Sequence, residues 1–161
     1  MVGESALRVL ALPGNSASGT ALAVALAGGR TGQPTEEAIR RLVNRFYALV
    51  RRDAALGPVF ARALGEDAEA WEAHLARLSD FWSSLMLTSG RYHGDPFSAH
   101  LRLPGLEPAM FDRWLALFGE ACAELFEPNL AATFRERADR VALSLRMGLF
   151  ERLPVARRGH A

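Results

Sequence analysis

The segment "TEEAIRRLVNRFYALVRRD", residues 35–53, carries the pattern that decides the fold. Its apolar side chains recur at intervals of three and four residues, at Ile39, Leu42, Val43, Phe46 and Val50. This spacing gathers them on one face of an α-helix, with Tyr47 at the edge of that face. Thr35 is a good N-cap, and the two glutamates that follow it suit the positive end of a helix. The segment therefore predicts an amphipathic helix that packs against a core.

Helical spacing continues through most of the chain that follows. It recurs from residue 67 to 85, from 108 to 126 and from 129 to 149, where Pro154 stops it. The stretch "LGPVF", residues 56–60, is expected to break the first helix, because glycine and proline disfavour its continuation. No segment alternates with period two for long enough to predict a strand. We therefore expect an all-α fold with four substantial helices.

Composition narrows the class of protein. A chain of 161 residues supplies one domain with a core of its own. With 19 basic and 18 acidic residues, the net charge of +1 predicts neither nucleic acid nor an anionic membrane as a partner. No apolar run approaches the length of a membrane span. The single cysteine, Cys122, excludes an internal disulfide, so we expect a cytoplasmic protein in which Cys122 is a small buried hydrophobe.

The two ends of the chain differ from its body. Residues 1–34 contain no aromatic side chain and are interrupted by two Gly-containing turns, which predicts a disordered N-terminal extension. Within it, "ALAVALAGG" is similar to the apolar core of a secretory signal. The region before it, however, is long, includes Glu4, and has only Arg8 as a positive charge. Residues 151–161 predict a flexible basic tail.

The longest irregular connection is "SGRYHGDPFSAHLRLPGL", residues 89–106, and long connections are often functional. Asp95 can cap a helix that begins at Pro96, so one or two turns should run to about Leu103. His100 lies near the end of that short helix and should point steadily in one direction. His93 lies on the exposed approach to it and should be solvated, as should His160 near the C-terminus.

Two interpretations of the histidines and aromatic residues remain open at this point. In the first, His100 is a capping or surface histidine, His74 belongs to the edge of a core, and the aromatic residues Tyr47, Phe60 and Trp114 simply pack there. In the second, the chain binds a haem, which needs an apolar slot, a proximal imidazole and polar groups on the distal face. Periodicity does not show whether these side chains converge.

A family resemblance favours the second interpretation. The blocks "FYALVRRDAALGPVF", "WEAHLARLSDFWSSLML", "GRYHGDPFSAHLRLPGL" and "FDRWLALFGEACAELF" resemble the successive motifs of the group III truncated haemoglobins, the two-over-two globins of bacteria. The resemblance covers residues 35–150 in order. It implies a globin-like fold, a truncated two-over-two helical sandwich around haem b, and it makes residues 35–150 the globin domain.

The resemblance also implies a role for individual residues. His100 matches the proximal iron ligand and Phe60 the phenylalanine that wedges against the porphyrin. Leu78 matches an apolar haem contact one turn after His74, which matches the distal-gate histidine. Tyr47 matches the distal tyrosine, and Trp114 matches the tryptophan that hydrogen-bonds the ligand.

Two functions follow from these implied roles. The first is reversible, tight binding of O2, NO or CO at ferrous iron, with Tyr47 and Trp114 as hydrogen-bond donors. The second is a haem enzyme that performs NO dioxygenation or peroxide reduction, in which the same donors stabilise developing charge. The sequence has no flavin or nicotinamide fingerprint, so the enzyme would need a separate reductase. A helical bundle that only mediates protein contacts would leave His100 and the distal donors unexplained.

Overall fold

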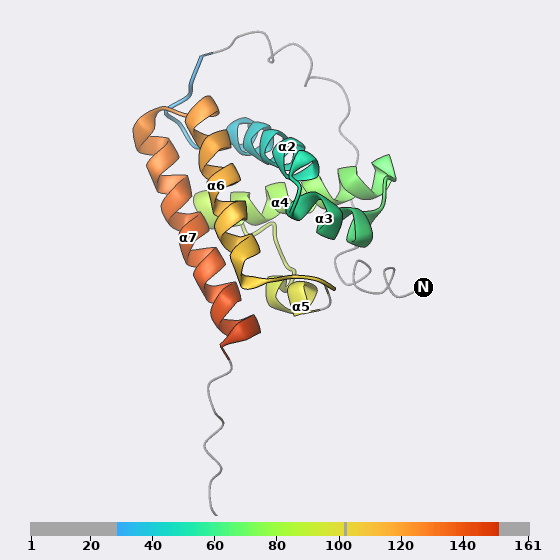
Figure 1. Cartoon of the computed structure of the whole chain (residues 1–161). Coiled ribbons are helices and arrows are strands. Elements are labelled where there is room, and N and C mark those ends of the chain that lie inside the picture. Colours follow the sequence, from blue (N-terminus) through green and yellow to red (C-terminus); the bar gives the residue numbers. More distant parts are fainter. Residues whose placement is uncertain (1–28, 102, 152–161) are drawn as a thin grey trace, which may run out of the picture.

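The computed structural model describes residues 29–101 and 103–151, and this part of the chain is helical (Figure 1). The helices are α2 (Glu36–Arg52), α3 (Leu56–Leu64), α4 (Ala68–Leu87), α5 (Pro96–Leu101), α6 (Pro108–Leu125) and α7 (Pro128–Phe150). Within these residues the β-structure is limited to an isolated bridge between Thr31 and Phe126. The predicted all-α class is confirmed. None of the described helices is long and apolar enough to cross a bilayer.

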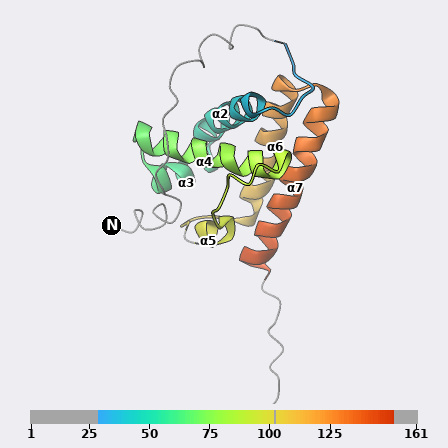
Figure 2. The ribbon, with the colours of Figure 1, turned by 180° about the vertical axis from the view of Figure 1, so that it is seen from behind.

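The long helices form two crossed pairs. Helices α6 and α7 run side by side in opposite directions, and α2 and α4 run across them (Figures 1 and 2). Helix α2 packs against both α4 and α6, so it joins the two pairs. The short helix α5 packs against α7. In this arrangement, one region of the interior is surrounded by α3, α5 and the ends of the long helices.

Polar caps set the starts of three helices where the sequence predicts them. The Thr35 hydroxyl accepts a hydrogen bond from the backbone N–H of Ala38 at 3.1 Å. The Asp67 carboxylate accepts one from Glu69, also at 3.1 Å. Asp95 accepts backbone bonds from two residues of the first turn of α5. Each cap satisfies N–H groups that have no partner inside the helix, so the chain is held at a defined entry angle.

The first helix does end near "LGPVF", as expected, but this stretch is itself helical. The break falls earlier, at Asp53, whose carboxylate accepts backbone N–H bonds from Ala55 and Leu56 at 3.0 Å each. A new helix, α3, then begins at Leu56. Pro58 is tolerated because it stands in the first turn, where a backbone N–H needs no helical partner. Gly57 is required by close approach, since a Cβ there would lie 2.9 Å from the Arg51 carbonyl oxygen.

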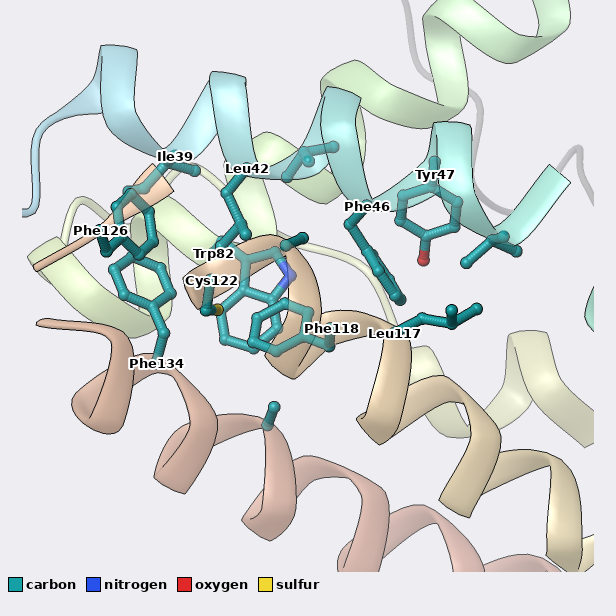
Figure 3. Packing of buried hydrophobic residues seen from close by; sticks show 14 of the residues in the cluster. Ile39, Leu42, Phe46, Tyr47, Trp82, Leu117, Phe118, Cys122, Phe126 and Phe134 are labelled. Carbon is teal, nitrogen blue, oxygen red and sulfur yellow. The ribbon is translucent and has the colours of Figure 1, made fainter. Parts of the chain in front are cut away.

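Aromatic stacking forms the centre of the core (Figure 3). Trp82 of α4 stacks on Phe118 of α6 with ring centroids 4.8 Å apart, and Phe134 of α7 packs beside them. Cys122 is fully buried among these residues, as predicted. Aromatic rings bury large apolar areas with few rotatable bonds, so this cluster fixes how the two helix pairs cross.

The globin domain is expected to start at residue 35, but backbone contacts with the helices begin earlier, at Thr31. Its N–H donates to the carbonyl of Leu125 at 3.1 Å, and its carbonyl accepts from Glu127 at 2.9 Å. These bonds tie the segment before α2 to the connection between α6 and α7. The expected disorder of residues 1–28, the flexible basic tail from residue 152 and the solvated His160 fall outside the described residues.

We expect a chain that begins at Gly29 to be more stable than one that begins at Thr35. The shorter chain lacks both backbone hydrogen bonds of Thr31, and each contributes about 0.5–1.5 kcal/mol, so the difference in free energy of unfolding should be about 1–3 kcal/mol. Urea unfolding of the two chains measures it, and both should bind haem in equal stoichiometry. Equal unfolding midpoints would show that the Thr31 bridge contributes nothing and that the body starts at Thr35.

Candidate functional site

A deep, mainly apolar cavity lies among helices α3 to α7 and the end of α2. The six residues singled out in the sequence, Tyr47, Phe60, His74, Leu78, His100 and Trp114, all line it. The rest of the wall is mostly hydrophobic and includes Leu56, Val59, Ala63, Leu64, Phe81, Ala99, Leu103, Leu106, Met110, Phe111, Val141, Ala142 and Leu145. The side chains that periodicity alone could not bring together therefore converge on one space.

Helix α5 holds the His100 ring in the tautomer that a metal ligand requires. Its Nδ1 lies 2.6 Å from the carbonyl oxygen of Pro96, one turn earlier in α5. A carbonyl oxygen only accepts, so Nδ1 carries the proton and Nε2 keeps its lone pair. Burial lowers the pKa of His100, which favours the neutral ring. A backbone carbonyl bound to the second ring nitrogen is the usual way proteins orient a ligating imidazole.

His74 lies in an aromatic enclosure and has an unsatisfied nitrogen. Its ring centroid is 5.5 Å from that of Tyr47 and 6.1 Å from those of Phe60 and Trp71. Its Nε2 is buried and has no hydrogen-bond partner among the described residues. Burial, with smaller contributions from the charges of Arg77 and His100, lowers the pKa of His74 to about 4. The imidazole is therefore neutral near pH 7, and Nε2 is free to interact with a molecule in the cavity.

Tyr47 and Trp114 bring two polar groups into an apolar setting. Tyr47 is 4% exposed, and its oxygen points away from α2 (Figure 3). Phe46 packs edge-on against both rings, with centroids at 4.7 and 5.1 Å. Burial raises the pKa of Tyr47, and the indole N–H of the nearby Trp114 acts in the opposite direction. An indole N–H can only donate, whereas a phenol O–H both donates and accepts, so each side chain can offer a donor to a molecule in the cavity.

Two lining residues, Arg77 and Tyr92, were not predicted from the sequence. Arg77 follows His74 by three residues on the same face of α4, and it belongs to none of the ion pairs formed by the described residues. A cation on an otherwise apolar stripe is a signal that could have indicated it. Tyr92 lies in irregular backbone, where no periodicity reveals its direction. His93, beside it, is exposed as predicted.

The donor set of the cavity fits haem better than a bare metal ion. Among residues 29–101 and 103–151, no group of three or more His, Cys, Asp or Glu side chains is placed to hold a metal. An iron on His100 would thus need most of its ligands from a macrocycle. The apolar walls suit the faces of such a ring. Arg77 has no carboxylate partner in the described part of the chain, so it suits the carboxylate groups at the edge of such a macrocycle.

Comparisons with known proteins agree with this cavity. No family model matches the chain. The chain is 36% identical, over 107 residues, to a group 3 truncated haemoglobin of Campylobacter jejuni, and the match covers 66% of this chain and 84% of that protein. The crystal structure of a group III truncated haemoglobin from Campylobacter jejuni superposes with a TM-score of 0.74 at 32% identity. That superposition covers 76% of this chain and 97% of the other.

Proposed function

The chain belongs to the group III truncated haemoglobins, and from this premise we propose that it binds haem b in the cavity and holds O2, NO or CO at ferrous iron. A bound haem would supply an iron atom that binds diatomic gases. The observation that carries the proposal is the pairing of a prepared imidazole, His100, with a wall of apolar residues and three polar side chains in the same cavity.

His100 would be the protein ligand of the iron, because its Nδ1–H is bound to Pro96 and its Nε2 lone pair is free. Phe60 and Leu78 are the proposed apolar contacts of the ring, since both line the cavity beside the histidines. Arg77 is the proposed partner of a haem carboxylate. Its pKa is lowered by burial, so a carboxylate that pairs with it would also relieve the cost of burying the guanidinium.

The distal side is proposed to hold its ligand through a chain of hydrogen bonds. In this proposal Trp114 donates to the phenol oxygen of Tyr47, whose pKa the indole already influences, and the Tyr47 hydroxyl then donates to the bound gas. Donors in such a chain polarise one another, and the surrounding apolar residues strengthen each bond. The arrangement supports tight retention and slow release. His74, whose Nε2 has no partner in the described residues, is the proposed gate over the site.

A haem enzyme is the second candidate function, and the buried donor pair also supports it. Donors fixed in a dry site stabilise negative charge that develops on a distal oxygen, as NO dioxygenation and peroxide reduction require. Both reactions consume electrons, which a separate reductase would supply. Loss of NO over many turnovers in the presence of an electron donor would separate this enzyme from a carrier.

Titration of the purified protein with haemin tests the common premise of both functions. We expect a Soret band that grows to one haem per chain, shifts on reduction with dithionite and shifts again under carbon monoxide. The apolar cavity and its single prepared imidazole are the reasons for this stoichiometry. A spectrum that stays that of free haemin at equimolar protein would exclude haem binding and both functions with it.

A further inference from the structure

The chain contains two tyrosines, Tyr47 and Tyr92, and both line the same cavity. They differ in their access to water. Tyr47 is almost completely buried, whereas Tyr92 is half-buried at the rim. A phenol that gives up an electron must also give up its proton, because the phenol radical cation is a strong acid. The two tyrosines therefore differ in their capacity to be oxidised, although both reach the cavity.

Tyr47 has no direct route to solvent for its proton. Burial raises its pKa, and its neighbours are Phe46, Phe60 and the neutral His74. Tyr92 can release its proton directly to water, since its side chain is only partly buried and borders solvent. Burial and the charge of Asp95 raise its pKa, so the resting side chain is a neutral phenol that still carries its proton.

Tyr92 is also held in place, which a reproducible electron donor requires. Its backbone N–H donates to the Ser84 hydroxyl at 2.9 Å, and its ring packs edge-on against Phe81 with centroids 5.3 Å apart. The ring folds over Gly94, where any Cβ would collide with it. The side chain is thus fixed between a wall of the cavity and the solvent.

A continuous row of aromatic rings joins the distal side of the cavity to Tyr92. Trp114 stacks on Phe118 at 5.4 Å, Phe118 stacks on Trp82 at 4.8 Å, and Phe81 lies 5.5 Å from Trp82 and 5.3 Å from Tyr92. Electrons move between redox-active side chains most readily over short gaps. In this row Trp114, Trp82 and Tyr92 are the oxidisable rings, and Phe118 and Phe81 fill the gaps between them, so the row links the cavity to Tyr92 in addition to the direct exposure of Tyr92 to the cavity.

We propose that Tyr92 donates an electron and a proton when hydrogen peroxide oxidises the haem site, and so carries oxidising equivalents from the cavity to the protein surface. The inference rests on the proposed haem binding. Two phenols, one from each of two chains, each lose one electron and one proton, and one hydrogen peroxide becomes two waters. The two phenoxyl radicals then couple through a carbon–carbon bond between their rings and regain aromaticity as a dityrosine.

The experiment treats the haem-loaded full chain with one equivalent of hydrogen peroxide. We expect a tyrosyl radical in freeze-quenched electron paramagnetic resonance, dityrosine fluorescence and a covalent dimer on denaturing gels. The dimer must survive thiol reductants, which excludes a disulfide through Cys122. Tyr92→Phe removes one hydroxyl, keeps the ring over Gly94, and should lose the dimer and the fluorescence. Tyr47→Phe should still form the dimer, whatever its effect on the rate of peroxide consumption.

The outcomes separate this inference from the haem proposal. An unchanged dimer yield in Tyr92→Phe overturns the role of Tyr92. A parent protein with a full Soret band that consumes peroxide without any radical or dimer also overturns it, and leaves haem binding intact. Absence of a Soret band would overturn both. Haem-free protein with peroxide is the matched control and should stay monomeric, because the oxidising equivalents then have no source in the cavity.

Discussion

His100→Gly is expected to weaken haem binding by at least about 100-fold, because it removes the one imidazole that α5 prepares as a ligand. Loss of a partner that merely orients a ligand costs about 10- to 100-fold in metal affinity, so loss of the ligand itself should cost more. In the structure, Nδ1 of His100 is bound to the Pro96 carbonyl, and the side chain lines the cavity. Transfer of haem to excess apomyoglobin measures the change.

Two comparisons distinguish ligation from a structural role of His100. Free imidazole should restore a native-like spectrum to His100→Gly, since it fits the vacated space and supplies the missing nitrogen. His93→Ala is the matched control, because His93 lies seven residues away on the same connection but is exposed. If both substitutions weaken haem binding equally, or if imidazole has no effect, then His100 is not the iron ligand.

Residues that act through local geometry were predictable from the sequence. The caps at Thr35, Asp67 and Asp95 lie where a polar side chain precedes an apolar periodic run, and the structure has helices starting at all three. The position of His100 on a short helix follows in the same way, from the Asp95–Pro96 start. In each case the interaction spans four residues or fewer, so the chain itself contains the information.

Features that depend on close approach between elements were not predictable. The helical state of "LGPVF" depends on the Asp53 carboxylate, which bonds the first turn of α3, and on the absence of a side chain at Gly57 near Arg51. The convergence of Tyr47, His74 and Trp114 depends on how α2, α4 and α6 cross, which periodicity leaves open. Only the family resemblance suggested it, and the structure places the side chains around one cavity.

Tyr47→Phe is expected to accelerate oxygen release by roughly ten- to a hundred-fold. The change deletes a single hydroxyl and keeps the ring in its contacts with Phe46 and Phe60. A hydrogen bond to a polarised ligand contributes about 1.5–3 kcal/mol, and each 1.4 kcal/mol corresponds to a factor of ten. Stopped-flow measurement of oxygen dissociation checks the rate. An off-rate within twofold of the parent would show that the hydroxyl does not contact the ligand.

Replacement of His74 by a smaller residue provides the contrasting variant. The neutral imidazole of His74 lies over the cavity among aromatic rings and does not bond to Tyr47 in the described structure. If it gates access, its removal should change mainly the association rate of oxygen. A change confined to the off-rate would instead make His74 a third group that binds the ligand.

Oxygen release from Trp114→Phe, alone and combined with Tyr47→Phe, shows whether Trp114 donates to the ligand directly or acts through Tyr47. If Trp114 acts through the phenol, its replacement should speed oxygen release in the parent but have little further effect once the Tyr47 hydroxyl is gone. If both residues donate directly, the two losses should add, because each then removes an independent bond. The influence of the Trp114 indole on the pKa of Tyr47 favours the first result, since an indole N–H directed at the phenol oxygen has no second proton to offer the ligand. Additive off-rates would mean that Trp114 turns away from Tyr47 when the ligand is present.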